Sequence, residues 1–332
     1  MTKNIAFVFL TAALTYNGYG AEYWVDGVSK ESGWYDANKT PTDDGYAWVD
    51  GDKGDVGTCH LATAANLVAW WQNRYADKLN TQGVPSTAEE IWATYKENQI
   101  VDSGGFVPYS FQWWLTGVEK PANEEEAVFT KDGFSGGDVI LKASDGFYRD
   151  LLLPYESGII DAEAYYDTGI SSALSSLLTS TSYGTNSFDS VSGDLLTALT
   201  GGCAVGMRLQ YSGGYHALTL WGAETDESGI ITKLWLTDSD DSKKTYGGIT
   251  DPSLFYVYVG ENGNGEMEIL NHGKANNYAD SDRGLDTFVI RGLTIVNPSS
   301  SDNWAWQSIP EPTTGTLSLL ALAGLLARRR RR

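Results

Sequence analysis

The sequence has few basic residues for its length. Its 332 residues include 23 Lys and Arg against 43 Asp and Glu, which gives a formal net charge of −20. Proteins bind nucleic acid through a basic surface that neutralises phosphates. The charge balance therefore argues against a nucleic-acid partner and predicts a soluble chain that anionic surfaces repel.

Cysteine is also scarce, because only Cys59 and Cys203 are present. Two cysteines are too few for the disulfide scaffold of a small secreted domain. They could form a single bridge with each other. In the alternative interpretation Cys59 is free to act as a nucleophile, and Cys203 is a buried thiol in the short run that follows Gly202.

Long apolar runs are absent as well, since none reaches the ~20 residues of a stable transmembrane helix. The first apolar run, over residues 5–14, follows Lys3 and precedes small residues that end at Ala21. A basic start, a short apolar stretch and small residues are typical of a signal peptide. We therefore expect residues 1–21 to be removed and the protein to be exported to the cell envelope or beyond it.

A second short apolar run covers residues 317–327, and five arginines, 328–332, follow it. A basic block after an apolar run stops translocation. With the Pro-Glu-Pro triplet at 310–312, this tail resembles the bacterial PEP-CTERM sorting signal. The resemblance implies a sorting signal over residues 310–332 that a membrane transpeptidase of the exosortase type handles, after a linker at 299–309. An ordinary tail anchor is the alternative.

The stretch from Leu61 to Trp71 is apolar except for Thr63 and Asn66. Its alanines and leucines are strong helix formers, and the lack of a polar stripe predicts a helix that is buried on most of its faces. Thr58 stands just before the helix and is a fair N-cap. Cys59 falls at the start of this helix, where the helix dipole favours an anion and a thiol loses its proton more easily. The alternative is that Cys59 is a small packing residue.

The rest of residues 22–298 is predicted to form one α+β domain, with helices in the first half and an antiparallel sheet in the second. Ser86 and Glu89 have the spacing of a capping box that opens a helix ending near Asn98. Further helices are expected over residues 109–115, 171–178 and 192–199, and strands over 204–210, 216–222, 231–237, 254–259 and 288–296.

The chain has three histidines, and His216 is the best candidate for a general base. It begins a strand that turns back into the strand ending at Asp238, so Asp238 or Asp240 is expected beside the imidazole. A carboxylate there would orient the ring and stabilise its cation. His60 adjoins Cys59 but points to another helix face, and His272 is the reserve base. The acidic run at 238–241 could instead be a solvated turn.

A cysteine that opens a buried helix, followed far downstream by a histidine and an aspartate, has the logic of papain-like proteases. The segments 216–223 and 236–240 resemble the His and Asp segments of the Mac/IdeS family of immunoglobulin-degrading cysteine endopeptidases. Residues 59–71 resemble that family's nucleophile helix, and residues 33–40 resemble the segment carrying its oxyanion-stabilising lysine. Residues 76–200 match only loosely.

Carried over residue by residue, the resemblance implies that Cys59 is the nucleophile and His216 the general base. It implies that Asp238 orients His216, that Asp240 is a supporting carboxylate, and that Lys39 and the Cys59 backbone N–H stabilise the oxyanion. No cofactor or metal is implied. Five acidic residues stand between Lys39 and Cys59, and they could instead hold Lys39 away from the site: Asp43, Asp44, Asp50, Asp52 and Asp55.

The sequence therefore predicts an exported cysteine endopeptidase with a papain-like α+β fold. Its partner would be a protein substrate, with immunoglobulin one possibility that the loosely matched middle region leaves open. Two other functions are compatible with the same fold. One is an exported binding or matrix protein that has lost activity, and the other is a transglutaminase or amidase that uses the same three residues.

Overall fold

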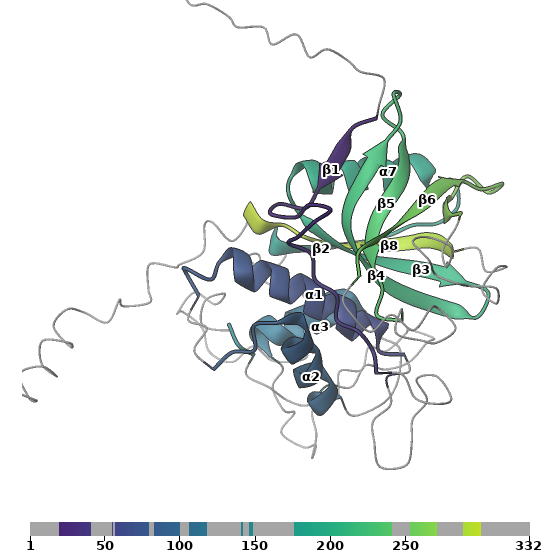
Figure 1. Ribbon diagram of the computed structural model, residues 1–332. Coiled ribbons are helices and arrows are strands. Elements are labelled where there is room, and N and C mark those ends of the chain that lie inside the picture. The colour runs from purple at the N-terminus through teal and green to yellow at the C-terminus, as the bar shows by residue number, and fades with distance from the viewer. Residues whose placement is uncertain are drawn as a thin grey trace, which may run out of the picture.

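The computed structural model describes residues 20–40, 55, 57–79, 83–99, 106–117, 141, 146–148, 176–240, 253–270 and 288–299 (Figure 1). The helices and strands follow in the order β1 (Glu22–Trp24), α1 (Cys59–Arg74), α2 (Ala88–Asn98), α3 (Val107–Thr116), β2 (Leu178–Ser182), α7 (Phe188–Thr200), β3 (Ala204–Tyr211), β4 (Gly214–Thr225), β5 (Ile231–Thr237), β6 (Phe255–Glu261), β7 (Met267–Ile269) and β8 (Phe288–Val296).

The strands form one antiparallel sheet with the order β1-β4-β3-β8-β7-β6-β5, and β2 pairs with β8 outside this path. A further pairing between β4 and β5 closes the sheet into a ring from β4 round to β5. Closure removes free strand edges, which are otherwise sites of unwanted pairing. β4 pairs with β1, β3 and β5, so the strand that carries His216 is fixed along both of its edges.

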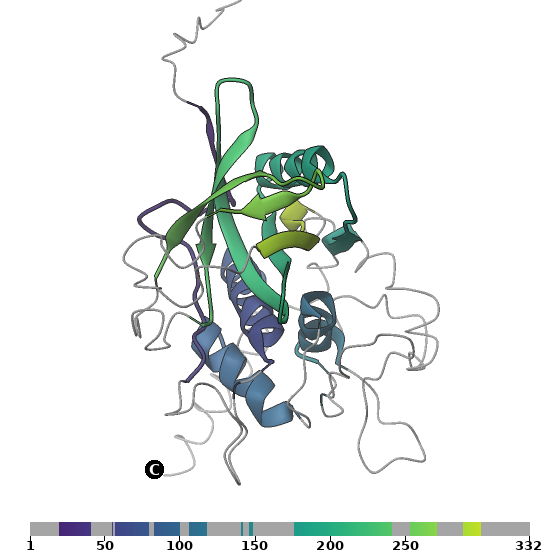
Figure 2. The ribbon, with the colours of Figure 1, turned by 90° about the vertical axis from the view of Figure 1, so that its right-hand side faces the viewer.

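The helices α1, α2 and α3 gather beside the sheet, while α7 lies apart from them (Figures 1 and 2). α1 is the centre of the first group, because it contacts α2 and α3 as well as β3 and β4. α7 packs instead against β1, β3, β4 and β7. α1 is thereby packed against β4, the strand that carries His216.

Helix α1 is buried along almost its whole length, from His60 to Gln72. Small residues let it approach the sheet closely. A Cβ added to Gly206 of β3 would lie 3.1 Å from Cγ2 of Thr63 and 3.3 Å from Cδ1 of Leu67. Buried amide side chains in α1 are hydrogen-bonded, as burial requires. Gln72, for example, donates to the Pro85 carbonyl at 2.8 Å and accepts from the Trp114 indole at 2.6 Å.

The α+β class and most of the predicted elements agree with the structure. The strands expected over 231–237 and 288–296 have the observed bounds, and the other three predicted strands differ from the observed ones by a few residues at their ends. The predicted helix over residues 61–71 is the interior of α1. The helices expected over 109–115 and 192–199 are α3 and α7, each longer than predicted.

Three local predictions were wrong. The capping box of α2 uses Thr87 and Glu90, one residue later than the Ser86 and Glu89 of the prediction, because the chain is still extended at Thr87. Thr58 stands at the start of α1 but does not cap it, since its hydroxyl donates to the Asp55 carbonyl at 2.6 Å. Leu178 does not end a helix.

Leu178 begins β2, and its backbone pairs with Val296 of β8. The Thr and Ser residues that follow it suit a strand, and sheet pairing overrides the weak helical pattern of this segment.

Several predictions lie outside the described residues. They include the signal peptide up to residue 19, the linker and sorting signal from residue 300 onward, the first part of the helix expected at 171–178, and His272. Among the helices that the structure does describe, none has the length and apolar character needed to cross a bilayer.

Candidate active site

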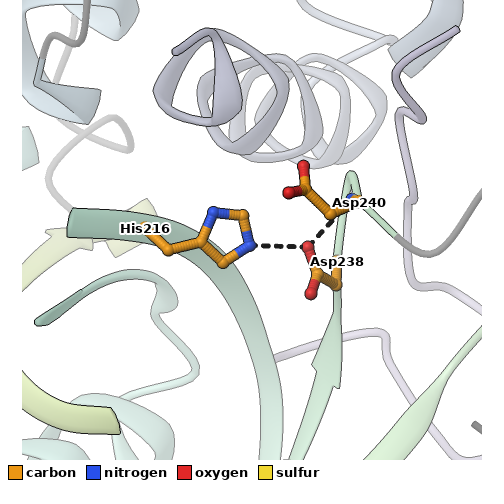
Figure 3. A group of neighbouring side chains, drawn as sticks. All are labelled: His216, Asp238 and Asp240. Carbon is orange, nitrogen blue, oxygen red and sulfur yellow. Dashed lines mark hydrogen bonds and ion pairs between the residues drawn. The ribbon is translucent and has the colours of Figure 1, made fainter. Parts of the chain in front are cut away.

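His216 and Asp238 form a buried hydrogen-bonded pair (Figure 3). Nε2 of the imidazole lies 2.7 Å from Oδ1 of Asp238, and both side chains are buried. The pairing of β4 with β5 brings them together, because Thr219 lies opposite Thr237 and the aspartate follows directly. Since Nε2 faces the carboxylate, Nδ1 is the ring nitrogen left for another partner.

The loop after β5 fixes the carboxylate of Asp238. The backbone N–H of Asp240 donates to Oδ1 of Asp238 at 2.9 Å, the same oxygen that faces His216 (Figure 3). The acidic run could have formed a solvated turn on the surface. Its described residues, Asp238 to Asp240, are instead buried, and Asp240 is only 7% exposed. Burial and two donors hold the Asp238 carboxylate in one orientation toward the imidazole.

Cys59 is the first residue of α1, and its thiol interacts with the side chain of His216. Burial raises the pKa of the Cys59 thiol, but the hydrogen bond and positive charge of His216 and the charge of Lys39 outweigh it, so that the pKa is lowered overall. The two cysteines do not form the alternative bridge. Burial raises the pKa of Cys203, so the two thiols differ in chemistry.

The pKa of the His216 imidazole is raised, whereas that of the Cys59 thiol is lowered. Burial alone would lower its pKa, but the charges of Asp238 and Asp240 and the hydrogen bonds to Asp238 and Cys59 raise it to about 10. A lowered thiol pKa beside a raised imidazole pKa favours a thiolate–imidazolium pair at neutral pH. Such a pair holds a ready nucleophile and a proton donor in contact.

Lys39 also contacts this cluster, through Asp240. Its Nζ lies 2.6 Å from Oδ1 of Asp240, and the side chain is only 4% exposed. Its backbone N–H also donates to the Ser239 carbonyl at 2.9 Å. Burial lowers the pKa of the Lys39 ammonium, but the charges of Asp240 and Cys59 raise it overall, which keeps the lysine charged.

The acidic residues before Cys59 were a possible reason for Lys39 to be held elsewhere. Asp55 is the one of these that the structure describes, and it pairs with Lys96 of α2 at 2.6 Å. Its other carboxylate oxygen accepts from the backbone N–H of Thr40 at 2.6 Å. Asp55 therefore anchors the chain beside Lys39 and does not compete for the ammonium.

Asn66 is a site residue whose role the sequence did not reveal. Its carbonyl oxygen accepts from the backbone N–H of Ala37 at 2.8 Å, and its amide donates to the Thr219 hydroxyl at 3.0 Å. A longer contact, 3.5 Å, joins it to the Thr237 hydroxyl. One buried side chain in α1 is thus bonded to the segment of Lys39, to the strand of His216 and to the strand that leads to Asp238.

Asp36 is a second buried group that the sequence analysis passed over. Its Oδ2 accepts from the backbone N–H of Ser253 at 2.8 Å and from the Asn38 amide at 3.2 Å. Burial, opposed by the bond from Ser253 and aided by the charge of Asp238, raises the pKa of Asp36 to about 8. Asp36 is therefore largely protonated at neutral pH, which avoids a further negative charge beside Asp238 and Asp240.

The donor atoms of His216, Asp238 and Asp240 lie within 4.8 Å of one another, close enough to bind a metal ion. The ammonium of Lys39 already lies against Asp240, and the imidazole already lies against Asp238. A divalent cation would have to compete with both positive groups at this position. The chemistry of the cluster therefore fits an ion-paired proton-transfer site better than a metal centre.

The His60 ring contacts the backbone just before α1. Its Nδ1 lies 3.1 Å from the Gly57 carbonyl, and burial lowers the pKa of the imidazole to about 3. A ring with so low a pKa cannot hold a proton for transfer at neutral pH. His216 is therefore the histidine that the structure brings to Cys59.

Comparisons with known proteins show similarity to a protease. The family model described as Mac 1 matches residues 174–277, a range that includes His216, Asp238 and Asp240. The chain is also similar to the protein named IgM protease of Streptococcus suis (strain P1/7), with 22% identity over 265 residues. That alignment covers 74% of this chain and 20% of the relative, so the chain spans about one fifth of the relative's length.

Proposed function

We propose that the protein is a cysteine endopeptidase with Cys59 as nucleophile and His216 as the acid and base. The observation that carries this proposal is the orientation of the His216 ring, with Nε2 on Asp238 and the Cys59 thiol as its other side-chain partner. A nucleophile, a base and a residue that orients the base are the three parts that acyl transfer needs. The similarity to the Mac 1 model and to a named protease supports the same class.

In this mechanism the Cys59 thiolate attacks the carbonyl carbon of a peptide bond, and the carbonyl electron pair moves to oxygen. The resulting tetrahedral intermediate collapses as the His216 imidazolium gives its proton to the departing amine, which leaves a thioester on Cys59. Water then attacks the thioester while His216 takes the proton, and the carboxylic acid product leaves with the thiolate restored. Asp238 keeps Nδ1 directed at the reacting atoms throughout.

The negative charge on the carbonyl oxygen needs hydrogen-bond donors. Cys59 is the first residue of α1, and the first backbone N–H groups of a helix have no partner within the helix. The second donor in the proposal is Lys39, whose charge already acts on the Cys59 thiol. An ammonium has three N–H donors, and that of Lys39 contacts Oδ1 of Asp240, within reach of the same cluster.

We propose a protein as substrate, without assigning its identity. The relative's name refers to IgM, but most of that relative's length has no counterpart in this chain. We also propose that the protein is exported by the signal peptide at 1–21 and sorted by the tail at 310–332. Intact-mass measurement on material from outside the cell tests this proposal. A protein that starts near Ala21 and lacks the arginines supports it, and a full-length chain refutes it.

The peptidase proposal is tested by incubating a protein mixture with the wild type and with Cys59→Ala, and mapping new termini by mass spectrometry. New termini with the wild type only are the expected result. A primary amine added in a second arm separates hydrolysis from cross-linking, since a transglutaminase would attach the amine to glutamine side chains. No new termini in any arm, with a folded protein, would favour the binding or matrix function.

A further inference from the structure

Arg208 of β3 lies next to the site and has no role in the mechanism above. In the pairing of β3 with β4, Leu209 lies opposite His216, and Arg208 lies opposite Ala217, the next residue along. Residues directly opposite each other in an antiparallel pair have Cα atoms about 4.5–5.5 Å apart. The backbone of Arg208 therefore lies beside β4, one residue along from the position opposite His216.

Arg208 lies on a face of the sheet that packs against α1. Gly206, two residues before Arg208 and on the same side of the strand, packs against Thr63, one turn after Cys59 in α1. Opposite Gly206 is Thr219, which bonds to Asn66 further along α1. Arg208 therefore shares its face of the sheet with residues that contact α1, the helix that begins with Cys59.

The guanidinium of Arg208 is held between two aromatic rings. Its Cζ lies 5.5 Å from the ring centre of Tyr215, the residue before His216, and 5.6 Å from that of Phe106 at the start of α3. Its Nη2 donates to the Ser182 hydroxyl at 3.2 Å and to the Arg291 carbonyl at 3.1 Å. Contacts with aromatic rings fix the plane of a guanidinium while its edge can still donate hydrogen bonds.

No carboxylate among the described residues pairs with Arg208. Its buried Nε has no hydrogen-bond partner there, and burial together with the charge of Arg291 lowers the pKa of the guanidinium. Arg291 differs, because it binds Glu266 at 2.6 Å. Within the part of the chain that the structure describes, Arg291 thus has a carboxylate partner and Arg208 does not.

We propose that Arg208, with Tyr215 and Phe106, forms a substrate subsite for an acidic side chain close to the scissile bond. This inference rests on the proposed peptidase function and names a feature of its substrate. A carboxylate fits because a guanidinium edge can donate two parallel hydrogen bonds to it. Tyr215 is 59% exposed, so the subsite opens to solvent on that side. A bound Asp or Glu would give Arg208 the anionic partner that the described residues do not supply.

The subsite is tested by cleavage of a peptide library prepared from denatured proteins, followed by sequencing of the new termini. The wild type is expected to favour Asp or Glu at one position within about three residues of the cleaved bond. Arg208→Gln should lose that preference, and Arg208→Glu should favour Lys or Arg at the same position. The matched control is Arg74→Gln, which removes the same charge from the last turn of α1 and should leave the preference unchanged.

A pair of peptides that differ only in Glu or Gln at the favoured position gives the magnitude. The wild type should cleave the Glu peptide with a kcat/KM about tenfold higher or more, since hydrogen bonds to charged groups are among the stronger ones. This measurement needs no variant, so it decides the proposal even if Arg208→Gln does not fold. Equal values for the two peptides, or an unchanged preference in a folded Arg208→Gln, would overturn the subsite. An absence of any cleavage by the wild type would instead count against the peptidase function.

Discussion

The side-chain oxygen of Asn66 accepts a hydrogen bond from the backbone N–H of Ala37, and this bond joins the helix of the nucleophile to the segment of the lysine. Asn66 stands seven residues after Cys59, and Ala37 stands two residues before Lys39. Through its bond to Thr219, Asn66 also reaches the strand of His216. The spacing between the proposed nucleophile, base and oxyanion donor therefore depends on one buried amide.

Asn66→Ala is expected to lower kcat for peptide cleavage while KM changes little, because the variant loosens the site without touching substrate. The unpaired Ala37 N–H should also cost about 1–3 kcal/mol of stability. Steady-state kinetics and denaturant unfolding measure the two effects. Asn73→Ala is the control, since Asn73 is an exposed asparagine on the same helix whose amide donates to the backbone carbonyls of Ala69 and Ser86. A change in KM alone would contradict the positioning role.

Cys59 should react with iodoacetamide at a lower pH than an ordinary thiol. Its pKa is lowered by His216 and Lys39, so the thiolate forms as pH rises through a value below 9.0, whereas the raised pKa of Cys203 keeps that thiol protonated. His216→Gln removes the hydrogen bond and the charge that lower the Cys59 pKa, and should move the profile to higher pH. Mass spectrometry of labelled peptides distinguishes the two thiols. Faster labelling of Cys203 would refute the assignment.

Lys39→Met should reduce kcat by about two orders of magnitude, the usual effect of losing one oxyanion donor. KM should change little, because this contact strengthens only in the transition state. The single variant leaves Asp240 buried without its partner, and breaking a buried pair is strongly destabilising. The double variant Lys39→Met with Asp240→Asn removes that charge and should recover stability but not kcat. A normal kcat in either variant would leave Cys59 N–H as the oxyanion donor.

Asp36 predicts a pH dependence of stability. Its pKa is about 8 in the folded protein against 3.8 as the ordinary value. Between these values the folded state binds the proton and the unfolded state does not, so the free energy of unfolding falls as pH rises from about 4 to 8. Asp36→Asn should be more stable than the wild type at pH 8 and show a flatter profile. A steeper profile in Asp36→Asn, measured by urea unfolding, would contradict the assignment.

Much of the fold could be predicted because the deciding information is local. The apolar run that begins at Leu61 has no polar stripe, so it had to be a buried helix, and the acidic end of β5 had to lie near the start of β4 once the hairpin was recognised. The part that could not be predicted depends on distant partners. Asn66 and Thr219 are 153 residues apart in the chain, and no local pattern links them.

Single polar residues were the hardest to interpret. Asp55 was one of five acidic residues that could have held Lys39 away from the site, yet it is 2% exposed and bonds Lys96 and the backbone of Thr40. Arg208 had no role assigned from the sequence, because the two rings near its guanidinium come from the residue that precedes α3 and from β4. Such roles follow from how the helices pack on the sheet, which composition and periodicity do not specify.

The most direct test of the central claim is detection of the acyl-enzyme. The wild type is mixed with a protein substrate, quenched in acid within the first turnovers, and analysed by intact and peptide mass spectrometry. A thioester that links a substrate fragment to Cys59, disappears as product forms and is absent from Cys59→Ser is the result that this mechanism predicts. Cleavage that persists in Cys59→Ser, or that proceeds with no adduct on Cys59, would contradict it.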